Sequence, residues 1–174
     1  MTGESVAARS DVDRLADLAR RHGLRVAVAE SLTSGMLASR LGAGPGAADW
    51  LGGAVVAYQT EVKERVLGLA PGVDPCSPDC AEQLAHGVRR LFAADVAVST
   101  TGIGGPDPQD GHPPGTVYLG WSTPDDDGHL LLRIEGDPPD VLEDAVAQAV
   151  RLLTVQVIAS WGDRGNSEGL FIRA

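Results

Sequence analysis

Aromatic residues and long apolar runs are both scarce in this chain of 174 residues. Phe, Trp and Tyr make up 4% of the sequence, so the core must be built from Val, Leu, Ala and Ile. No apolar stretch reaches the roughly 18–20 residues of a membrane span. The first residues also lack the charged start and apolar centre of a signal peptide. We therefore expect a cytoplasmic protein without a membrane partner.

Basic charge is also scarce. The chain has 14 Lys and Arg against 24 Asp and Glu, a net charge of −10 that is spread along the sequence. No basic stripe appears, so binding to nucleic acid through phosphate neutralisation is not expected. A phosphorylated small molecule remains a possible ligand, provided that the site supplies local hydrogen-bond donors.

Only two cysteines are present, Cys76 and Cys80, in a Pro-rich connector. No second pair completes a zinc site, so we expect reduced thiols and no metal. The length suits one domain with a core of its own. We place this domain at residues 1–160 and interpret residues 161–174, which are rich in Gly and charge, as a flexible tail.

Apolar segments alternate with amphipathic ones along most of the chain. Expected helices cover residues 10–22 (capped by Ser10 or Asp11), 30–41, 61–67 (capped by Thr60), 78–92 (capped by Ser77 or Asp79) and 139–160; expected strands cover residues 25–29, 53–58, 95–100, 116–122 and 129–134. The last two strands flank a Pro-Asp-Asp-Asp-Gly turn and predict a hairpin. This order predicts a three-layer α/β/α sandwich with a mixed, mostly parallel sheet of about five or six strands.

A glycine-rich loop follows the strand at 95–100. Residues 100–107 read Thr-Thr-Gly-Ile-Gly-Gly-Pro-Asp. Ligands of open α/β sheets bind beyond the carboxyl ends of strands, and glycines let the backbone approach an anion or oxyanion closely. The alternative is a tight turn between strands.

Two further junctions carry polar side chains. Ser31, Thr33 and Ser34 lie where a strand passes into a helix, so their hydroxyls and the free helix N–H groups favour a phosphate or carboxylate, unless they act only as caps. Tyr58 ends an apolar strand, and Lys63 lies in the first turns of the next helix. Such a lysine is a candidate base with a lowered pKa; the alternative is a surface lysine. A parallel sheet would bring the three junctions together.

These segments, in this order, resemble the C-terminal domain of the CinA family (competence/damage-inducible protein A). The matching stretches are residues 29–35, 53–58 with Glu61 and Lys63, 100–107 and 114–118. The resemblance spans roughly residues 10–160. It implies hydrolysis of the carboxamide of nicotinamide mononucleotide to the acid and ammonia, with no cofactor, and we expect a homo-oligomer.

The resemblance implies catalytic roles for Lys63 and Tyr58, and we add Ser31 as the nearest candidate by motif for the nucleophile. The ligand-binding residues that we expect are Glu30, Thr33, Ser34, Thr100, Thr101, Gly102, Gly104, Gly105 and Asp107. One part of the family pattern is missing. A serine usually follows the Pro-Gly turn, but Pro45-Gly46 is followed by Ala47-Ala48, and alanine has no atom that can attack a carbonyl.

Other departures accompany this one. Leu32 and Ser34 replace the usual cysteine and glycine, while Pro138 and Leu142 stand at positions where the family usually has arginines. Lost arginines remove bidentate partners for a phosphate. The glycine loop would therefore face a pocket without its serine.

Three functions remain open. In the first, the protein is an amidohydrolase of weak activity that uses Ser31, Thr33 or Thr101 as its nucleophile. In the second, it has lost catalysis and binds a nucleotide-like ligand or a partner protein. In the third, it is a structural subunit that oligomerises through the hairpin and the long helix. Removal of a nucleophile usually costs orders of magnitude in rate, which favours the second of these.

Overall fold

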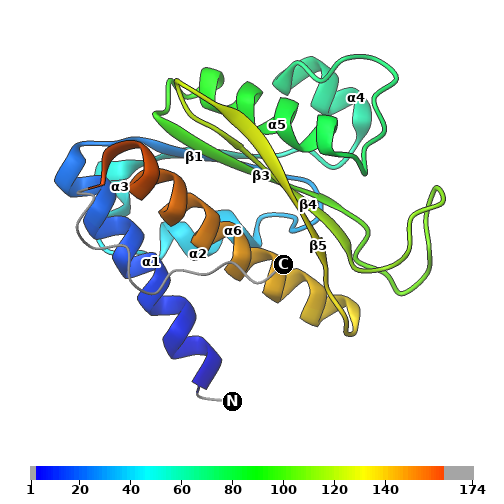
Figure 1. Ribbon diagram of the computed structural model, residues 1–174, viewed down its shortest axis with the longest axis horizontal. Helices are drawn as coiled ribbons and strands as arrows, with labels where there is room; N and C mark the ends of the chain where they lie inside the picture. The colour runs from blue at the N-terminus through cyan, green and yellow to red at the C-terminus, as the bar shows by residue number, and fades with distance from the viewer. Residues whose placement is uncertain (1–2, 163–174) are drawn as a thin grey trace.

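The computed structural model describes residues 3–162, and a five-stranded sheet forms its middle layer (Figure 1). The strands are β1 (Val26–Glu30), β2 (Leu51–Val56), β3 (Val96–Gly102), β4 (Thr116–Ser122) and β5 (Asp127–Arg133). Their order is β2-β1-β3-β4-β5, with β2, β1 and β3 parallel and the β4–β5 hairpin antiparallel. The predicted three-layer fold with a mixed sheet is confirmed, with five strands.

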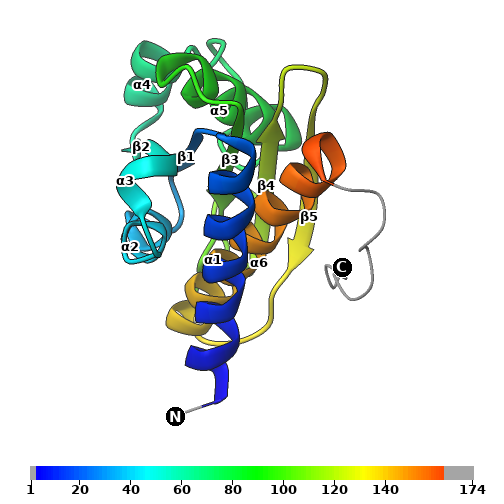
Figure 2. The same cartoon turned by 90° about the vertical axis from the view of Figure 1, so that its left-hand side faces the viewer.

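Helices cover both faces of the sheet. One face carries α1 (Gly3–His22), α2 (Met36–Gly42) and α6 (Pro138–Trp161), and the other carries α5 (Pro78–Leu91) with the short α4 (Thr60–Val62) and the π-helix η1 (Lys63–Leu67) (Figures 1 and 2). A further short helix, α3 (Ala47–Trp50), leads directly into β2. The hydrophobic core is divided by the sheet into two clusters, the larger one under α1 and α6 and the smaller one under α5.

The burial of the strands explains the order of the sheet. Every residue of β1 is buried, and so is β3 apart from its last residue, as expected for parallel strands covered on both faces. β2 is different, because it forms an edge and most of its residues are only partly buried. The expectation of a second apolar strand is met, but the strand ends at Val56 rather than at Tyr58.

Three helical segments differ from the sequence expectation. The helix expected at residues 30–41 begins only at Met36, after the turn at 31–35. α1 begins at Gly3, so Ser10 and Asp11 lie inside the helix and not at its N-cap. Neither glycine nor proline interrupts the sequence between Gly3 and Gly23, and one polar residue inside a helix costs little. After β2, the expected single helix is instead α4 followed by η1, with Gln59 in place of Thr60 as N-cap.

Other local signals are confirmed. Gly23 ends α1 with a positive φ of 64°, and Ser77 caps α5 by accepting a hydrogen bond from the Cys80 N–H at 3.1 Å. No helix within residues 3–162 is both long and apolar enough to cross a bilayer. α6 continues to Trp161, and the remainder of the expected tail, residues 163–174, lies outside the described residues.

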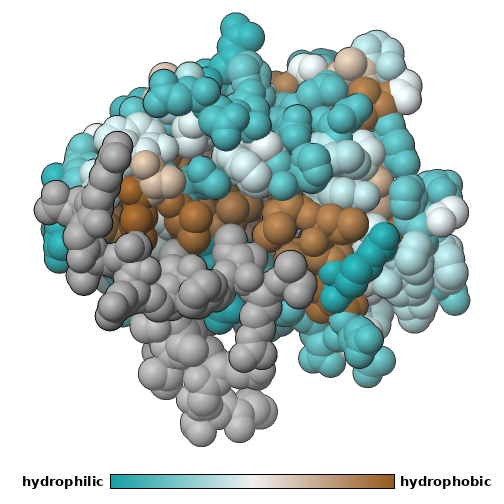
Figure 3. Space-filling model, in the orientation of Figure 1, coloured by the Kyte–Doolittle hydropathy of each residue, from teal (hydrophilic) through white to brown (hydrophobic). Residues whose placement is uncertain are grey.

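The face that carries α6 has an apolar surface band. Figure 3 shows hydrophobic residues gathered along α6 and the neighbouring part of the sheet. Partly buried residues that pack on the core here include Leu130 of β5, Leu142 of α6 and Ile134, which follows β5.

Candidate functional site

The carboxyl ends of the three parallel strands lie side by side. Glu30, the last residue of β1, pairs with Val56 of β2 on one side and with Thr100 of β3 on the other. The segments that follow these residues are the three junctions singled out in the sequence. The sheet therefore brings the junctions to one edge, which we call the carboxyl edge.

Glu30 occupies the amino end of α2. Its side chain is fully buried, and its carboxylate accepts hydrogen bonds from the N–H groups of Gly35 (2.9 Å), Leu37 (3.1 Å) and Ala38 (2.7 Å). The expectation that the helix N–H groups are free for a ligand anion is wrong, because the carboxylate of the chain itself already binds them. Glu30 thus positions the turn at 31–35.

The hydroxyls of this turn point in different directions. Thr33 Oγ1 donates to Glu30 at 2.6 Å and lies 2.8 Å from Thr100 Oγ1, and both threonines are fully buried. Ser31 is 8% exposed and its N–H donates to the Thr100 carbonyl at 2.9 Å. Ser34 is exposed, with a φ of 49°. Of the three predicted hydroxyls, those of Ser31 and Ser34 lie nearest to solvent.

Lys63 is the single lysine of the chain, and it is 2% exposed at the start of η1. Burial lowers the pKa of its ammonium group below the ordinary 10.5, and the neighbouring thiols of Cys80 and Cys76 oppose part of this shift. π-Helical turns occur frequently at functional sites. A lone lysine with a lowered pKa, at the carboxyl edge, is the strongest candidate for a proton-transfer group in the described chain.

Both cysteines are free and buried beside Lys63. Burial raises the pKa of the Cys76 thiol to about 11, and Asp74 contributes to the rise. Burial also raises the pKa of Cys80, although Lys63 and Thr101 act against it. Because the thiolate is the reactive form, the raised pKa of each group favours the less reactive thiol near neutral pH.

Tyr58 has very different surroundings from Lys63. It lies two residues beyond β2 and is 70% exposed. The expectation that it ends an apolar strand is wrong, because β2 stops at Val56, and β2 is an edge strand that the helical layers cover only in part. Both residues follow β2 at the carboxyl edge, but only Lys63 is enclosed.

The glycines of the 100–107 loop serve internal packing. A Cβ on Gly102 would lie 2.2 Å from the Thr116 carbonyl oxygen, and one on Gly104 would lie 3.2 Å from Leu32. Gly105 has a φ of 90° and faces Pro114. These positions need glycine because the loop packs closely on its own chain. Asp107, farther along the loop, is exposed.

Thr101 contributes to fixing this loop against its neighbours. Its hydroxyl donates to the Pro75 carbonyl at 2.5 Å, and it is 1% exposed. His112, farther along, lies 2.8 Å from the carboxylate of Asp74. Burial raises the pKa of Asp74, but the Cys76 N–H and His112 outweigh this effect, so that the pKa lies below its ordinary value.

Arg133 is a cation that the sequence analysis did not single out. It ends β5, pairs in register with Thr116, and its guanidinium donates to the Thr116 hydroxyl. Because the hairpin is antiparallel, the end of β5 returns to the edge where β3 ends. The hairpin signal, read together with strand direction, could have placed this arginine at the carboxyl edge.

The Ala47–Ala48 pair lies at the opposite edge. α3 directly precedes β2, whereas Tyr58 and Lys63 follow it, and Figure 1 shows α3 and α4 at opposite ends of the sheet. The six residues of β2 span about 20 Å. The expectation that Ala48 and the glycine loop share one pocket of one chain is therefore wrong.

The two positions where the family usually has arginines adjoin the glycine loop. Leu142 lies 3.9 Å from the Cβ position of Gly104, and Pro138 lies 3.9 Å from that of Gly105. Apolar side chains thus line this part of the loop, where arginines would have supplied hydrogen-bond donors.

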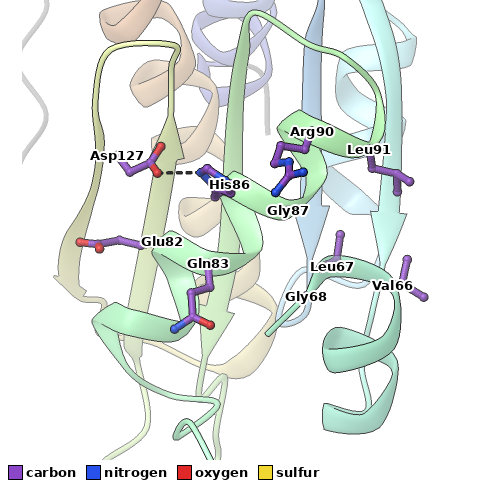
Figure 4. Close-up of a pocket in the computed structure, with 10 residues that line it drawn as sticks. All are labelled: Val66, Leu67, Gly68, Glu82, Gln83, His86, Gly87, Arg90, Leu91 and Asp127. Carbon is purple, nitrogen blue, oxygen red and sulfur yellow. Dashed lines mark hydrogen bonds and ion pairs between the residues drawn. The ribbon is translucent and has the colours of Figure 1, made fainter. Parts of the chain in front are cut away.

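A separate cleft of about 500 Å³ lies between α5, η1 and the start of β5. Figure 4 shows its lining, with His86 directed at Asp127 across the cleft at 2.8 Å. None of the predicted site residues lines it. Within residues 3–162, no three His, Cys, Asp or Glu side chains are grouped so that they could hold a metal ion.

The fold and the carboxyl edge together define a three-layer α/β domain in which a buried lysine, Lys63, lies beyond the end of a parallel strand. The family model of the CinA C-terminal domain matches residues 9–157. The chain therefore belongs to the CinA C-terminal domain family.

Relatives agree with this assignment. The chain is 32% identical over 162 residues to a competence-damage inducible protein of Halalkalibacterium halodurans, which covers 90% of this chain and 38% of the relative. It is 39% identical over 132 residues to a CinA-like protein of Frankia casuarinae, and this match covers 74% of this chain and 30% of the relative. The chain thus spans well under half of the length of these curated relatives.

Solved structures show the same fold. A CinA superfamily protein from Klebsiella pneumoniae superposes with a TM-score of 0.83 at 30% identity, covering 88% of this chain and 99% of the other. The competence/damage inducible protein CihA from Agrobacterium tumefaciens gives a TM-score of 0.74 at 27% identity, and the superposition covers 83% of this chain and 95% of the other.

Proposed function

We propose that the carboxyl edge binds a pyridine nucleotide, as the resemblance to the CinA amidohydrolases implies, and that the chain hydrolyses the nicotinamide carboxamide weakly or not at all. The observation that supports this most is Lys63. A buried lysine is costly unless it serves a purpose, and this chain keeps its single lysine at the edge where α/β proteins bind ligands.

Binding an anionic nucleotide to a chain of net charge −10 requires local donors. Ser34 and Arg133 are exposed donors at the edge, and Ser31 and Lys63 are buried donors in the segments that follow β1 and β2. Asp107 offers an exposed acceptor for the sugar hydroxyls. Thr33, Thr100 and Thr101 are buried and hydrogen-bonded, so we assign them to the support of these groups.

Weak turnover follows from the chemistry of the replaced residues. Amide hydrolysis needs a nucleophile, a base and donors for the oxyanion. Position 48, where the family has its serine, carries an alanine and lies about 20 Å from this edge within one chain, so it offers no nucleophile. In our proposal Ser31 is the substitute nucleophile, with Lys63 as its base and Tyr58 as a donor. The backbone of Ser31 is fixed by the hydrogen bond from its N–H to the Thr100 carbonyl, and this residue is only 8% exposed, which limits the approach of a substrate to its hydroxyl.

The test combines ammonia release from nicotinamide mononucleotide with calorimetry of its binding. We expect saturable binding with slow or undetectable ammonia release, and a loss of any turnover in Lys63→Ala. Arg65→Ala removes an exposed cation two residues away and is the matched control. Fast turnover by the wild type would contradict the weak-activity proposal, and the absence of both binding and turnover would favour a structural subunit.

A further inference from the structure

The two faces of the sheet offer different chemistry at the carboxyl edge. On the face that carries α6, Leu32 and Leu142 lie 3.2 Å and 3.9 Å from the Cβ position of Gly104, and both pack in or against the larger core cluster. Lys63 lies on the other face, because η1 packs against α5. The α6 side of the glycine loop is thus lined by hydrocarbon, and the buried cation lies on the α5 side.

Arg133 is a second cation on the α5 side of the edge. Side chains of a strand alternate between its two faces, and Asp127 and His129, which share the phase of Arg133 on β5, both contact α5. Arg133 is the last residue of β5 and therefore lies on the α5 face at the carboxyl edge. Burial raises the pKa of the Cys76 thiol, and the nearby Arg133 guanidinium opposes this rise. Cys76 also adjoins Lys63, so the two cations lie around the same thiol.

A buried threonine fixes the guanidinium of Arg133. The guanidinium donates to the hydroxyl of Thr116, which is fully buried and itself donates to the Pro113 carbonyl at 2.8 Å. Because the one hydroxyl proton is directed at Pro113, the oxygen of Thr116 presents its lone pairs to the arginine. Within residues 3–162 the guanidinium has no ion pair and no further hydrogen bond. Arg133 is exposed, so its other N–H groups face solvent in a fixed orientation.

Two carboxylates near Cys76, those of Asp74 and Asp110, could repel an anionic ligand from this place. The carboxylate of Asp74 accepts a hydrogen bond from the Cys76 N–H at 2.8 Å and lies 2.8 Å from Nε2 of His112. Two donors of the chain therefore already share its charge. Asp110 is exposed, and solvent ions screen it. Both effects reduce the repulsion.

We propose that Arg133 binds the phosphate of a pyridine mononucleotide and thereby makes the carboxyl edge selective for nucleotides over nucleosides. A guanidinium matches a phosphate in a bidentate geometry, and Arg133 presents such a fork on the face that carries Lys63. The positions where the family usually has arginines, Pro138 and Leu142, adjoin the glycine loop and offer no donor there. The phosphate is therefore held by the end of β5. This inference rests on the proposed function, which supplies the pyridine part of the ligand.

Isothermal titration calorimetry of the full chain with three probes tests this phosphate subsite. Nicotinamide mononucleotide and nicotinamide riboside differ only in the phosphate, and ribose phosphorylated at its primary hydroxyl carries the phosphate without the pyridine ring. We expect the wild type to bind the mononucleotide at least about tenfold more tightly than the riboside, because charge-assisted bidentate pairs are strong. Arg133→Gln should abolish this preference and leave the affinity for the riboside within about twofold of the wild type.

Arg90→Gln is the matched control. Arg90 is also an exposed arginine without an ion pair in the described part of the chain. It lines the cleft beside Asp127, at the opposite end of β5 from Arg133. The control changes the net charge by the same amount and should keep the preference. Arg133→Lys keeps the charge but loses the fork, so it should retain only part of the preference.

The wild-type comparison of the two pyridine compounds and the lysine variant test the subsite even if Arg133→Gln does not fold. Equal binding of both compounds by the wild type, a preference that survives Arg133→Gln, or an equal loss in Arg90→Gln would each overturn the subsite and leave the proposed function standing. If the phosphorylated ribose binds through Arg133 and neither pyridine compound binds, the proposed function is refuted and the subsite is retained. A chain that binds none of the three probes would refute both.

Discussion

Glu30 holds together the turn on which the candidate site is built. Its carboxylate accepts four hydrogen bonds, three at one oxygen, from Thr33, Gly35 and Leu37, and one at the other, from the Ala38 N–H at 2.7 Å. Glu30→Gln keeps one acceptor oxygen and leaves one donor without a partner. A buried donor without a partner costs about 1–3 kcal/mol, so we expect Glu30→Gln to lower the free energy of unfolding by about 2 kcal/mol.

Glu30→Ala removes all four acceptor contacts. Hydrogen bonds to charged groups contribute about 1.5–3 kcal/mol each, and neighbouring contacts are not additive. We therefore expect a loss of about 4–6 kcal/mol, which approaches the whole stability of about 5–15 kcal/mol of a typical domain. The free energy of unfolding is measured by urea denaturation followed by far-UV circular dichroism, with an unchanged m-value.

Glu61→Gln provides the control, because Glu61 is an exposed acid on α4 and should change stability by less than about 0.5 kcal/mol. A loss below about 1 kcal/mol for Glu30→Ala would refute the reasoning, since three backbone donors and a buried hydroxyl would then have found other partners. Equal losses for Glu30→Gln and Glu30→Ala would refute the assignment of three donors to one oxygen.

Three other predictions concern the surroundings of Lys63 and α5. Gly87→Ala places a Cβ 1.9 Å from the Leu67 carbonyl oxygen, so urea denaturation should show a free energy of unfolding lower by about 3 kcal/mol. An unchanged free energy of unfolding would mean that η1 can move away from the new methyl group. Lys63 is the single lysine, so NMR titration of its side chain should give one midpoint below 10.5. Folded Lys63 then binds fewer protons than the unfolded chain, so the free energy of unfolding of the wild type, relative to Lys63→Met, should rise with pH up to about 10.5. A difference that does not change with pH would contradict the lowered pKa. Ser77→Ala removes the acceptor of the Cys80 N–H and should lower the free energy of unfolding, measured by thermal denaturation, by about 1 kcal/mol. An unchanged stability would mean that water replaces the serine as the acceptor.

Local pattern was sufficient for much of the fold. The apolar runs of β1 and β3 predict central strands because both of their faces are buried, and Ser77 predicts its helix because a hydroxyl must meet the first free N–H groups. The edge position of β2 could not be predicted in this way, since an apolar run of six residues suits a central strand equally well.

The roles of the polar residues depended on contacts that spacing does not contain. Glu30 looks like a ligand-binding carboxylate beside three hydroxyls, and only the fold of the 31–35 turn shows that the helix N–H groups are already taken. The glycines at 102, 104 and 105 suggest a ligand cradle, yet the atoms that approach them belong to Thr116, Leu32 and Pro114.

The sequence by itself determined the fold class, the family and the three junctions, because these depend on hydrophobic periodicity and on motifs that are local in the chain. Only the tertiary structure decided which side chains share a space. Strand order and direction place Lys63 and Arg133 at the carboxyl edge and carry Ala48 about 20 Å away, to the other end of β2. The physical reason is that burial and hydrogen-bond partners are set by residues far apart in the sequence.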